Sequence, residues 1–383
     1  MRRFAFGCLA LFGCGYNATI LETRSALDEH NPEAALYRID QGLGVASPTE
    51  LPRSLDGDKA LLVLQRASLL QALGRYEDSR RDFAAADTAL DELDVSRSRR
   101  VRQTMKLVGF IGTSAERGGK VVSVKELAEV CNAESPTLEY EASPTERALL
   151  TTLNVANWLA LGDARGAVVE ARRLEVAARF AHDHGDVTTE KTIAFGETLG
   201  AFAAERADGA SESELVVLFA RGRAPAKSFA NAAPSEVEAK IGGAVSPEIL
   251  ALGKKRIAQE AAAHPTVYGV GQSTTTRVPT LSPEEPGAGE LTVDGERVAP
   301  QWTLDVAAAI TDEWARVEKR HLAACYVCGC PSADLRGWET LPATLGVVRA
   351  KLAPGKHVVE GGRVPITIDL APGEWKTIVV TAR

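Results

Sequence analysis

The chain has 383 residues, of which 45% are hydrophobic and 25% charged, and its net charge is −7. This length accommodates roughly two or three domains with proper cores, and the mild acidity gives no electrostatic reason to expect nucleic acid as a partner. Aromatic residues make up only 5%, so the alanine-rich composition suits closely packed helices better than a large β core.

The amino terminus carries the sharpest pattern in the chain. Met1-Arg2-Arg3 is a short basic head, and the apolar run Phe4–Phe12 has the length of a signal peptide's hydrophobic region, too short to span a bilayer. The run leads into Leu11-Phe12-Gly13-Cys14, which resembles a bacterial lipobox. The resemblance implies cleavage before Cys14, a diacylglyceryl thioether on its sulfur and acylation of its new amino group.

The expected location follows from this anchor. Two or more acyl chains give stable membrane attachment where a single chain is marginal. Gly15, rather than Asp, follows Cys14, so in a two-membrane bacterium the resemblance implies sorting to the outer membrane, facing the periplasm. No later segment approaches the length of a transmembrane helix, so the lipid is the only membrane contact predicted. The alternatives are an ordinary signal peptide and a buried amino-terminal helix.

Two helices, Ala18–Glu29 and Asn31–Leu43, are expected to form a first hairpin, with Asn31 as N-cap and Pro32 at the first helical position. The stretch Ala60–Leu93 then predicts a second hairpin, because two runs of apolar residues at helical spacing flank Gly74. This unit resembles a tetratricopeptide repeat.

A second copy of that repeat begins near Arg147, where Gly162 matches Gly74. At the same offset the matching pairs are Ala67 with Val155, Leu70 with Trp158, Phe83 with Ala171, and Ala86 with Leu174. Ser143 and Glu146 stand at capping-box spacing before this copy. A further helix, Glu190–Arg206, follows it.

Stacked hairpins of this kind bind other molecules along a concave side. We expect the first helix of each copy to line that side, with the residues between the packing positions free for contacts. These predicted groove residues are Gln65, Arg66, Ser68, Leu153, Asn154 and Asn157. The predicted occupant is a segment of an envelope protein.

The carboxyl-terminal half has a β-type pattern. Glu214–Ala220 is a β-type run, and Asp294-Gly295 marks a hairpin turn within Leu291–Val298. A long helix is expected over Thr303–Ala324. Short strands with Pro-Gly turns follow, at Trp338–Leu341, Gly346–Leu352, His357–Glu360, Val364–Leu370 and Trp375–Thr381.

The predicted fold class is therefore α+β. A tetratricopeptide-like helical array precedes a mixed carboxyl-terminal domain with a small antiparallel sheet or sandwich. The expected division is a signal peptide over residues 1–13, the helical domain over 14–207, a connecting region with a flexible loop over 208–290, and the α+β domain over 291–383.

The densest cluster of potential ligands is His321 with Cys325, Cys328 and Cys330. A tetrahedral zinc site could be built from these four residues. An exported chain, however, meets an oxidising compartment in which thiols pair. Once Cys14 is acylated, these three cysteines and Cys131 form an even set, so disulfides, zinc and free thiols all remain open.

Leu69–Phe83, Trp158–Leu174, Gly222-Arg223-Ala224-Pro225 and Leu335–Val358, together with the lipobox, resemble a family of bacterial lipoproteins. That family combines tetratricopeptide-like helices with a β-rich tail. The resemblance implies architecture and location, and no activity.

No His-Glu-x-x-His, Gly-x-Ser-x-Gly or Walker A sequence is present, and no cofactor is predicted. The favoured hypothesis is a lipid-anchored, non-catalytic scaffold for a protein partner. The alternative is an envelope enzyme acting on peptidoglycan or another glycan, which would need a pair of carboxylates about 5–10 Å apart in a cleft.

Overall fold

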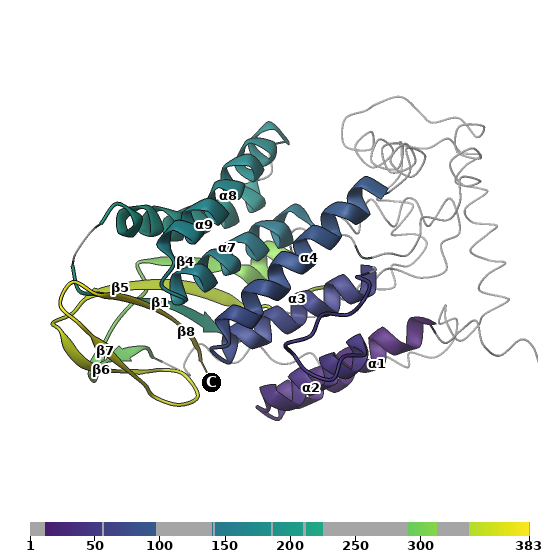
Figure 1. The fold of residues 1–383 in the computed structure, drawn as a ribbon, viewed down its shortest axis with the longest axis horizontal. Coiled ribbons are helices and arrows are strands. Elements are labelled where there is room, and N and C mark those ends of the chain that lie inside the picture. Colours follow the sequence, from purple (N-terminus) through teal and green to yellow (C-terminus); the bar gives the residue numbers. More distant parts are fainter. Residues whose placement is uncertain are drawn as a thin grey trace, which may run out of the picture.

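The computed structural model describes residues 12–55, 57–96, 140, 142–184, 187–209, 212–224, 290–311 and 337–382 (Figure 1). The fold is α+β, as the sequence predicts: a helical region precedes mixed and antiparallel sheets. The helices are α1 (Phe12–Asp28), α2 (Pro32–Leu43), α3 (Gly57–Ala72), α4 (Tyr76–Ser96), α7 (Pro144–Ala160), α8 (Ala164–His184) and α9 (Val187–Ala207).

The helices pair as hairpins, α1 with α2, α3 with α4 and α7 with α8. Gly74 (φ 74°) ends α3 and Gly162 (φ 78°) ends α7, both in the left-handed conformation that glycine adopts without strain. In both hairpins the next amide reaches back five residues, Arg75 N to Leu70 O at 2.8 Å and Asp163 N to Trp158 O at 3.0 Å. This is the same Schellman cap twice, which confirms the predicted repeat.

Two predicted helix starts are also confirmed. Asn31 accepts a hydrogen bond from Ala34 N at the start of α2. The Ser143 hydroxyl accepts from Glu146 N, while the Glu146 carboxylate accepts from Ser143 N, which completes the capping box of α7. Each cap satisfies backbone groups that the first helical turn leaves unpaired.

Two four-stranded sheets follow. The strands are β1 (Glu214–Arg221), β2 (Thr292–Val293), β3 (Glu296–Arg297), β4 (Trp302–Asp305), β5 (Thr344–Lys351), β6 (Gly355–Glu360), β7 (Ile366–Leu370) and β8 (Trp375–Thr381). The first sheet has the order β4-β5-β1-β8, with β1 antiparallel to β5 and parallel to β8. The second has the order β3-β2-β6-β7 and is antiparallel throughout.

The first sheet is the middle of three layers. Helices cover one of its faces, and the second sheet covers the other (Figure 1). Alternate residues of β1 serve the two cores: Val216, Leu218 and Ala220 join the helical core, and Leu215, Val217 and Phe219 join the core between the sheets. Because both faces are covered, β1 is a nearly continuous apolar run instead of an alternating one.

Three features differ from the sequence predictions. First, β1 comes from the expected connecting region, yet it lies inside the first sheet. Second, the helix expected to start at Thr303 begins only at Val306, because residues 302–305 form β4 and Asp305 Oδ1 caps Ala308 N at 2.8 Å. Third, residues 338–341 form a turn instead of a strand. The predicted continuation of the helix to Ala324 lies outside the described residues.

Candidate functional site

The six predicted groove residues are all buried. None of them exposes more than 8% of its surface, which is the value for Ser68; the others are Gln65, Arg66, Leu153, Asn154 and Asn157. The prediction that they face an open groove is therefore wrong. The physical reason lies in what covers α3 and α7.

A turn of the carboxyl-terminal region fills the space beside α3. The indole of Trp338 is buried, lies edge-on to Phe83 of α4 at 5.8 Å between ring centroids, and donates its Nε1–H to Ser68 Oγ at 2.8 Å. Its backbone N–H approaches Glu146 of α7 at 3.3 Å. Trp338 thus contacts α3, α4 and the start of α7, in the position that a bound segment of a partner was expected to take.

Neighbouring residues hold this turn in place. Thr340 donates its hydroxyl to Gln65 O at 3.2 Å, and Glu339 forms an ion pair with Arg24 of α1. Burial raises the pKa of Glu339, and the Arg24 charge partly offsets that effect. Between α3, α7 and the first sheet there remains a cavity of about 70 Å³, far below the 300 Å³ or more of typical ligand sites.

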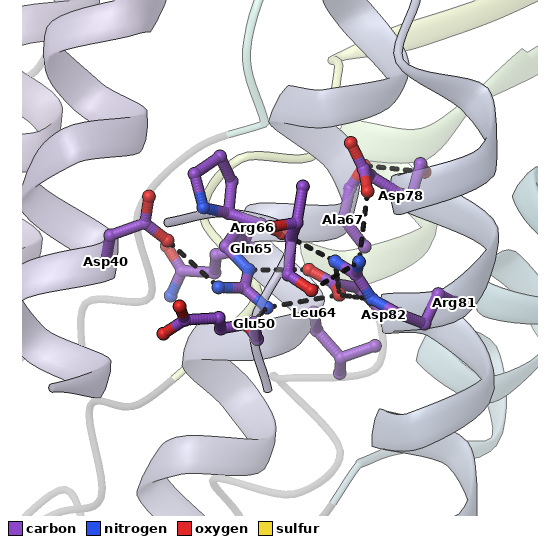
Figure 2. Close-up of polar contacts among 12 residues, drawn as sticks. Asp40, Glu50, Leu64, Gln65, Arg66, Ala67, Asp78, Arg81 and Asp82 are labelled. Atoms are coloured by element: carbon purple, nitrogen blue, oxygen red, sulfur yellow. Dashed lines mark hydrogen bonds and ion pairs between the residues drawn. The ribbon is translucent and has the colours of Figure 1, made fainter. Parts of the chain in front are cut away.

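Arg66 faces the other way, toward α2 and α4 (Figure 2). Its guanidinium makes two parallel bonds to Asp82, Nε to Oδ2 at 2.6 Å and Nη2 to Oδ1 at 3.1 Å. It also binds Asp40 of α2 at 2.9 Å and the carbonyl of Glu50 at 2.8 Å. Arg81 continues the network, donating to the carbonyls of Pro48 and Thr49.

This network is a structural tie. Arg66 and Asp82 are both fully buried, and buried ion pairs persist only when their donors and acceptors are satisfied. Burial lowers the pKa of Arg66, but the hydrogen bonds and charges of Asp82 and Asp40 outweigh burial and leave that pKa raised. The result joins α2, α3, α4 and the loop before α3, and it presents no charge to a partner.

The second-copy residues are also used internally. Asn157 donates to Ser79 Oγ at 2.9 Å and accepts from Gln71 Nε2 at 2.8 Å, which ties α7 to α3 and α4. Asn154 hydrogen-bonds to Glu170 of α8. Leu153 lines the small cavity beneath the first sheet.

An open cleft lies elsewhere, between α9 and β4, with a volume of about 570 Å³. The α9 wall presents Thr188, Lys191, Phe195 and Thr198. Their three- and four-residue spacing places them on one face of the helix. Phe195 is buried at the base, whereas Lys191 is exposed.

The opposite wall is the edge strand of the first sheet. Trp302 and Leu304 of β4 lie two residues apart, so they share the sheet face that α9 covers. Leu304 is buried in the helical core, while Trp302 keeps 39% of its surface exposed at the cleft. Asp305 also lines the cleft, with one carboxylate oxygen engaged in capping Ala308. The cleft therefore combines an aromatic surface with one ammonium and one carboxylate.

The remaining predicted sites are placed as follows. Cys14 lies in the first turn of α1. Cys131, Cys325, Cys328 and Cys330 lie outside the described residues. Among the residues that are described, no group of three or more His, Cys, Asp and Glu side chains is arranged to hold a metal ion. None of the described helices is both long and apolar enough to cross a bilayer.

Comparisons of the chain with family models, curated proteins and solved structures give no match. The function of this chain is therefore inferred from its own geometry.

Sequence reasoning missed the roles of Trp338 and Trp302. Each was placed within an expected regular element or beside one, and nothing local distinguishes a buried indole from one at a cleft. The available signal for Trp302 was the position of Asp305, whose spacing to Ala308 is that of an N-cap. Such a cap would have moved the start of the expected helix from Thr303 to Val306 and left the indole on the preceding strand.

Proposed function

We propose that this chain is a lipid-anchored cell-envelope scaffold that binds an extended segment of a protein partner in the cleft between α9 and β4. The observation that carries the proposal is the cleft itself, whose volume of about 570 Å³ falls within the range of ligand sites. It replaces the helical groove as the binding surface, because the groove is filled by the chain's own Trp338 turn.

The arrangement of the walls indicates how a segment would bind. In the described part of the chain β4 pairs with β5 alone, so its outer edge is a place where an extended peptide can add as a strand. An apolar side chain of that peptide would pack against Trp302 and Phe195. Lys191 and Asp305, at the rim, would favour a peptide with charges of both signs.

Binding is favoured over glycan hydrolysis. Of the described residues that line the cleft, Asp305 is the only carboxylate, and glycosidic chemistry generally uses two. Nucleic acid is a poor electrostatic match for a chain of net charge −7. No cofactor enters the proposal.

The anchor is the second part of the proposal and rests on Leu11-Phe12-Gly13-Cys14. Lipidation of Cys14 would hold the chain on the periplasmic side of the outer membrane. A Cys14→Ser variant should therefore appear in the soluble fraction or remain unprocessed. Membrane fractionation of this variant at the processed size would contradict the anchor and leave the cleft proposal standing.

The cleft is tested by site-specific photocrosslinking in intact cells. A photoreactive residue at Thr303 or Lys191 should give a discrete adduct with a protein, and Trp302→Ala should reduce its yield by about tenfold or more, as expected for an aromatic anchor. Tyr37, an aromatic residue of α2 with 58% of its surface exposed, is the matched control position. Equal adducts from position 37, or turnover of peptidoglycan by the purified chain, would overturn the proposal.

A further inference from the structure

A row of exposed arginines and valines runs along the outer face of α8. Its members are Arg165, Val169, Arg172, Val176 and Arg179, all exposed. Val169 and Val176 keep 65% and 72% of their surfaces open to solvent. We call these five residues the arginine–valine stripe.

The spacing makes the stripe straight and narrow. Steps of four and three residues alternate along it, so at 100° per residue the five side chains fall within about 80° of the helix circumference. At 1.5 Å per residue the stripe is about 21 Å long. In heptad terms Val occupies the two a positions and Arg the three d positions, so the stripe has the spacing at which one helix faces another, with charge at d in place of an apolar residue.

The arginines of the stripe outnumber the nearby carboxylates, of which the exposed Glu175 lies one helical turn from Arg172 and Arg179. Among the described residues none forms an ion pair with Arg165, Arg172 or Arg179. This contrasts with Arg173 on the flank, which pairs with Asp87 of α4. A face with three cations on a chain of net charge −7 is electrostatically selective, because it attracts an anionic partner that the rest of the surface repels.

We propose that this stripe docks an acidic amphipathic helix of another protein. Apolar residues of that helix would pack beside Val169 and Val176, and its carboxylates would meet Arg165, Arg172 and Arg179. A second copy of this chain is a poor occupant, since its own arginines would oppose these. An anionic lipid surface fits less well, because interfacial helices usually insert large apolar side chains, and the stripe offers two valines.

This surface is independent of the cleft. The stripe belongs to α8, and the cleft is lined by α9 and β4. Both could be occupied together, which would let the scaffold hold two segments of one partner or two partners at once.

The experiment uses the full chain and a synthetic 21-residue helix that carries isoleucine at a positions and glutamate at d positions. Saturable binding is expected by fluorescence anisotropy, weakening as salt rises. Arg165→Glu, Arg172→Glu and Arg179→Glu combined should reduce the affinity by about tenfold or more. The matched control is Arg53→Glu, a charge reversal at an exposed arginine in the loop before α3, which should leave binding unchanged.

Charge exchange makes the test specific. The same peptide with lysine at the d positions should fail to bind the native chain and should bind the triple variant. The double variant Val169→Ala with Val176→Ala keeps all three arginines and should still weaken binding. Attraction between charges alone would leave the affinity of this variant unchanged. Should the triple variant lose its thermal transition, Arg172→Gln alone replaces it.

Three results would overturn the proposal: no binding of the acidic peptide, equal binding of both peptides, or preference for phosphatidylglycerol vesicles over the peptide. The cleft variant Lys191→Glu should not affect peptide affinity. Failure of the stripe is thus distinguishable from failure of the cleft.

Discussion

The α3–α4 and α7–α8 hairpins share a backbone plan, yet their matched side chains do different jobs. With Gly74 aligned to Gly162, Arg66 corresponds to Asn154 and Asp82 to Glu170. In the first copy this pair is a buried ion pair with two parallel bonds. In the second it is an amide bonded to a carboxyl group. Both copies therefore have a polar contact between their two helices at the same positions. The contact includes an arginine in the first copy and an uncharged amide in the second.

The second difference concerns size. Phe83 of the first copy packs edge-on against Trp338, whereas its counterpart Ala171 lies beneath α9. A Cβ added at Gly200 would lie only 2.8 Å from that of Ala171, so α9 approaches α8 closely. The local sequence pattern thus determines the backbone of each hairpin. The element that packs against the hairpin determines which side-chain sizes fit there.

The largest expected effect comes from the polar pair. Arg66→Met would leave Asp40 buried without its ion-pair partner and Asp82 with Arg81 alone, and it should lower the free energy of unfolding by about 3–5 kcal/mol. The matched change Asn154→Leu removes one hydrogen bond to Glu170, which keeps Arg173 at 3.6 Å, and should cost only about 1–2 kcal/mol. Urea unfolding measures both.

Arg53→Met is the control for losing an arginine side chain, and it should change the unfolding free energy by less than about 0.5 kcal/mol. Equal losses at positions 66 and 154 would break the comparison, since they would mean that the two contacts are energetically alike.

The intermediate effect comes from exchanging size. Ala171→Phe gives the second copy the ring of the first, and α9 leaves no room for it. Overpacking of this kind should destabilise the chain by about 1–3 kcal/mol in thermal or urea unfolding. The control is Phe83→Leu at the matching position of the first copy. Leucine keeps much of the volume beside Trp338, so the free energy of unfolding should fall by less than about 1.5 kcal/mol. If Ala171→Phe left the free energy of unfolding unchanged, α8 and α9 would be able to move apart without a loss of stability.

Sequence alone supplied the local features. The hairpins, the glycine caps and the capping box before α7 depend on residues within one or two turns, so periodicity and cap chemistry predict them. The apolar run of β1 was also predicted from the sequence. Its parallel pairing with β8 was not, because that contact joins segments more than 150 residues apart and no local pattern encodes it.

The failed groove prediction has the same origin. Arg66 was placed on a solvent-facing side because it falls between apolar positions. In the structure every residue from Ala60 to Gln71 is buried, because α2, α4, α7 and the first sheet surround α3. A helix in the middle of an array has no solvent face. The occupant of its concave side, Trp338, comes from a distant turn.

The smallest expected effect compares the two carboxyl groups, because burial raises the pKa of both Glu170 and Asp82 and they differ in the cation that each one meets. Burial raises the pKa of Glu170 above its usual value, and the Arg173 charge and the Asn154 hydrogen bond only partly offset it. A carboxyl group with a raised folded-state pKa contributes stability below its unfolded pKa and loses that contribution as pH rises through the folded value. At neutral pH its ionised form is therefore a net cost. Glu170→Gln should stabilise the chain at pH 7, by less than about 1 kcal/mol, and should not do so near pH 4.

Asp82→Asn, at the matching position, should do the opposite at pH 7 although burial raises the pKa of Asp82 as well, because Asp82 is the counter-ion of the fully buried Arg66. The amide cannot replace the charge that Arg66 meets at 2.6 Å, so a buried guanidinium would keep only Asp40 as its counter-ion, and the chain should be destabilised. Urea unfolding of both variants at pH 4 and pH 7 gives the comparison. Changes of the same sign at pH 7 would mean that the buried ion pair of the first copy and the amide–carboxyl contact of the second contribute alike to stability, and the electrostatic distinction between the two hairpins would fail.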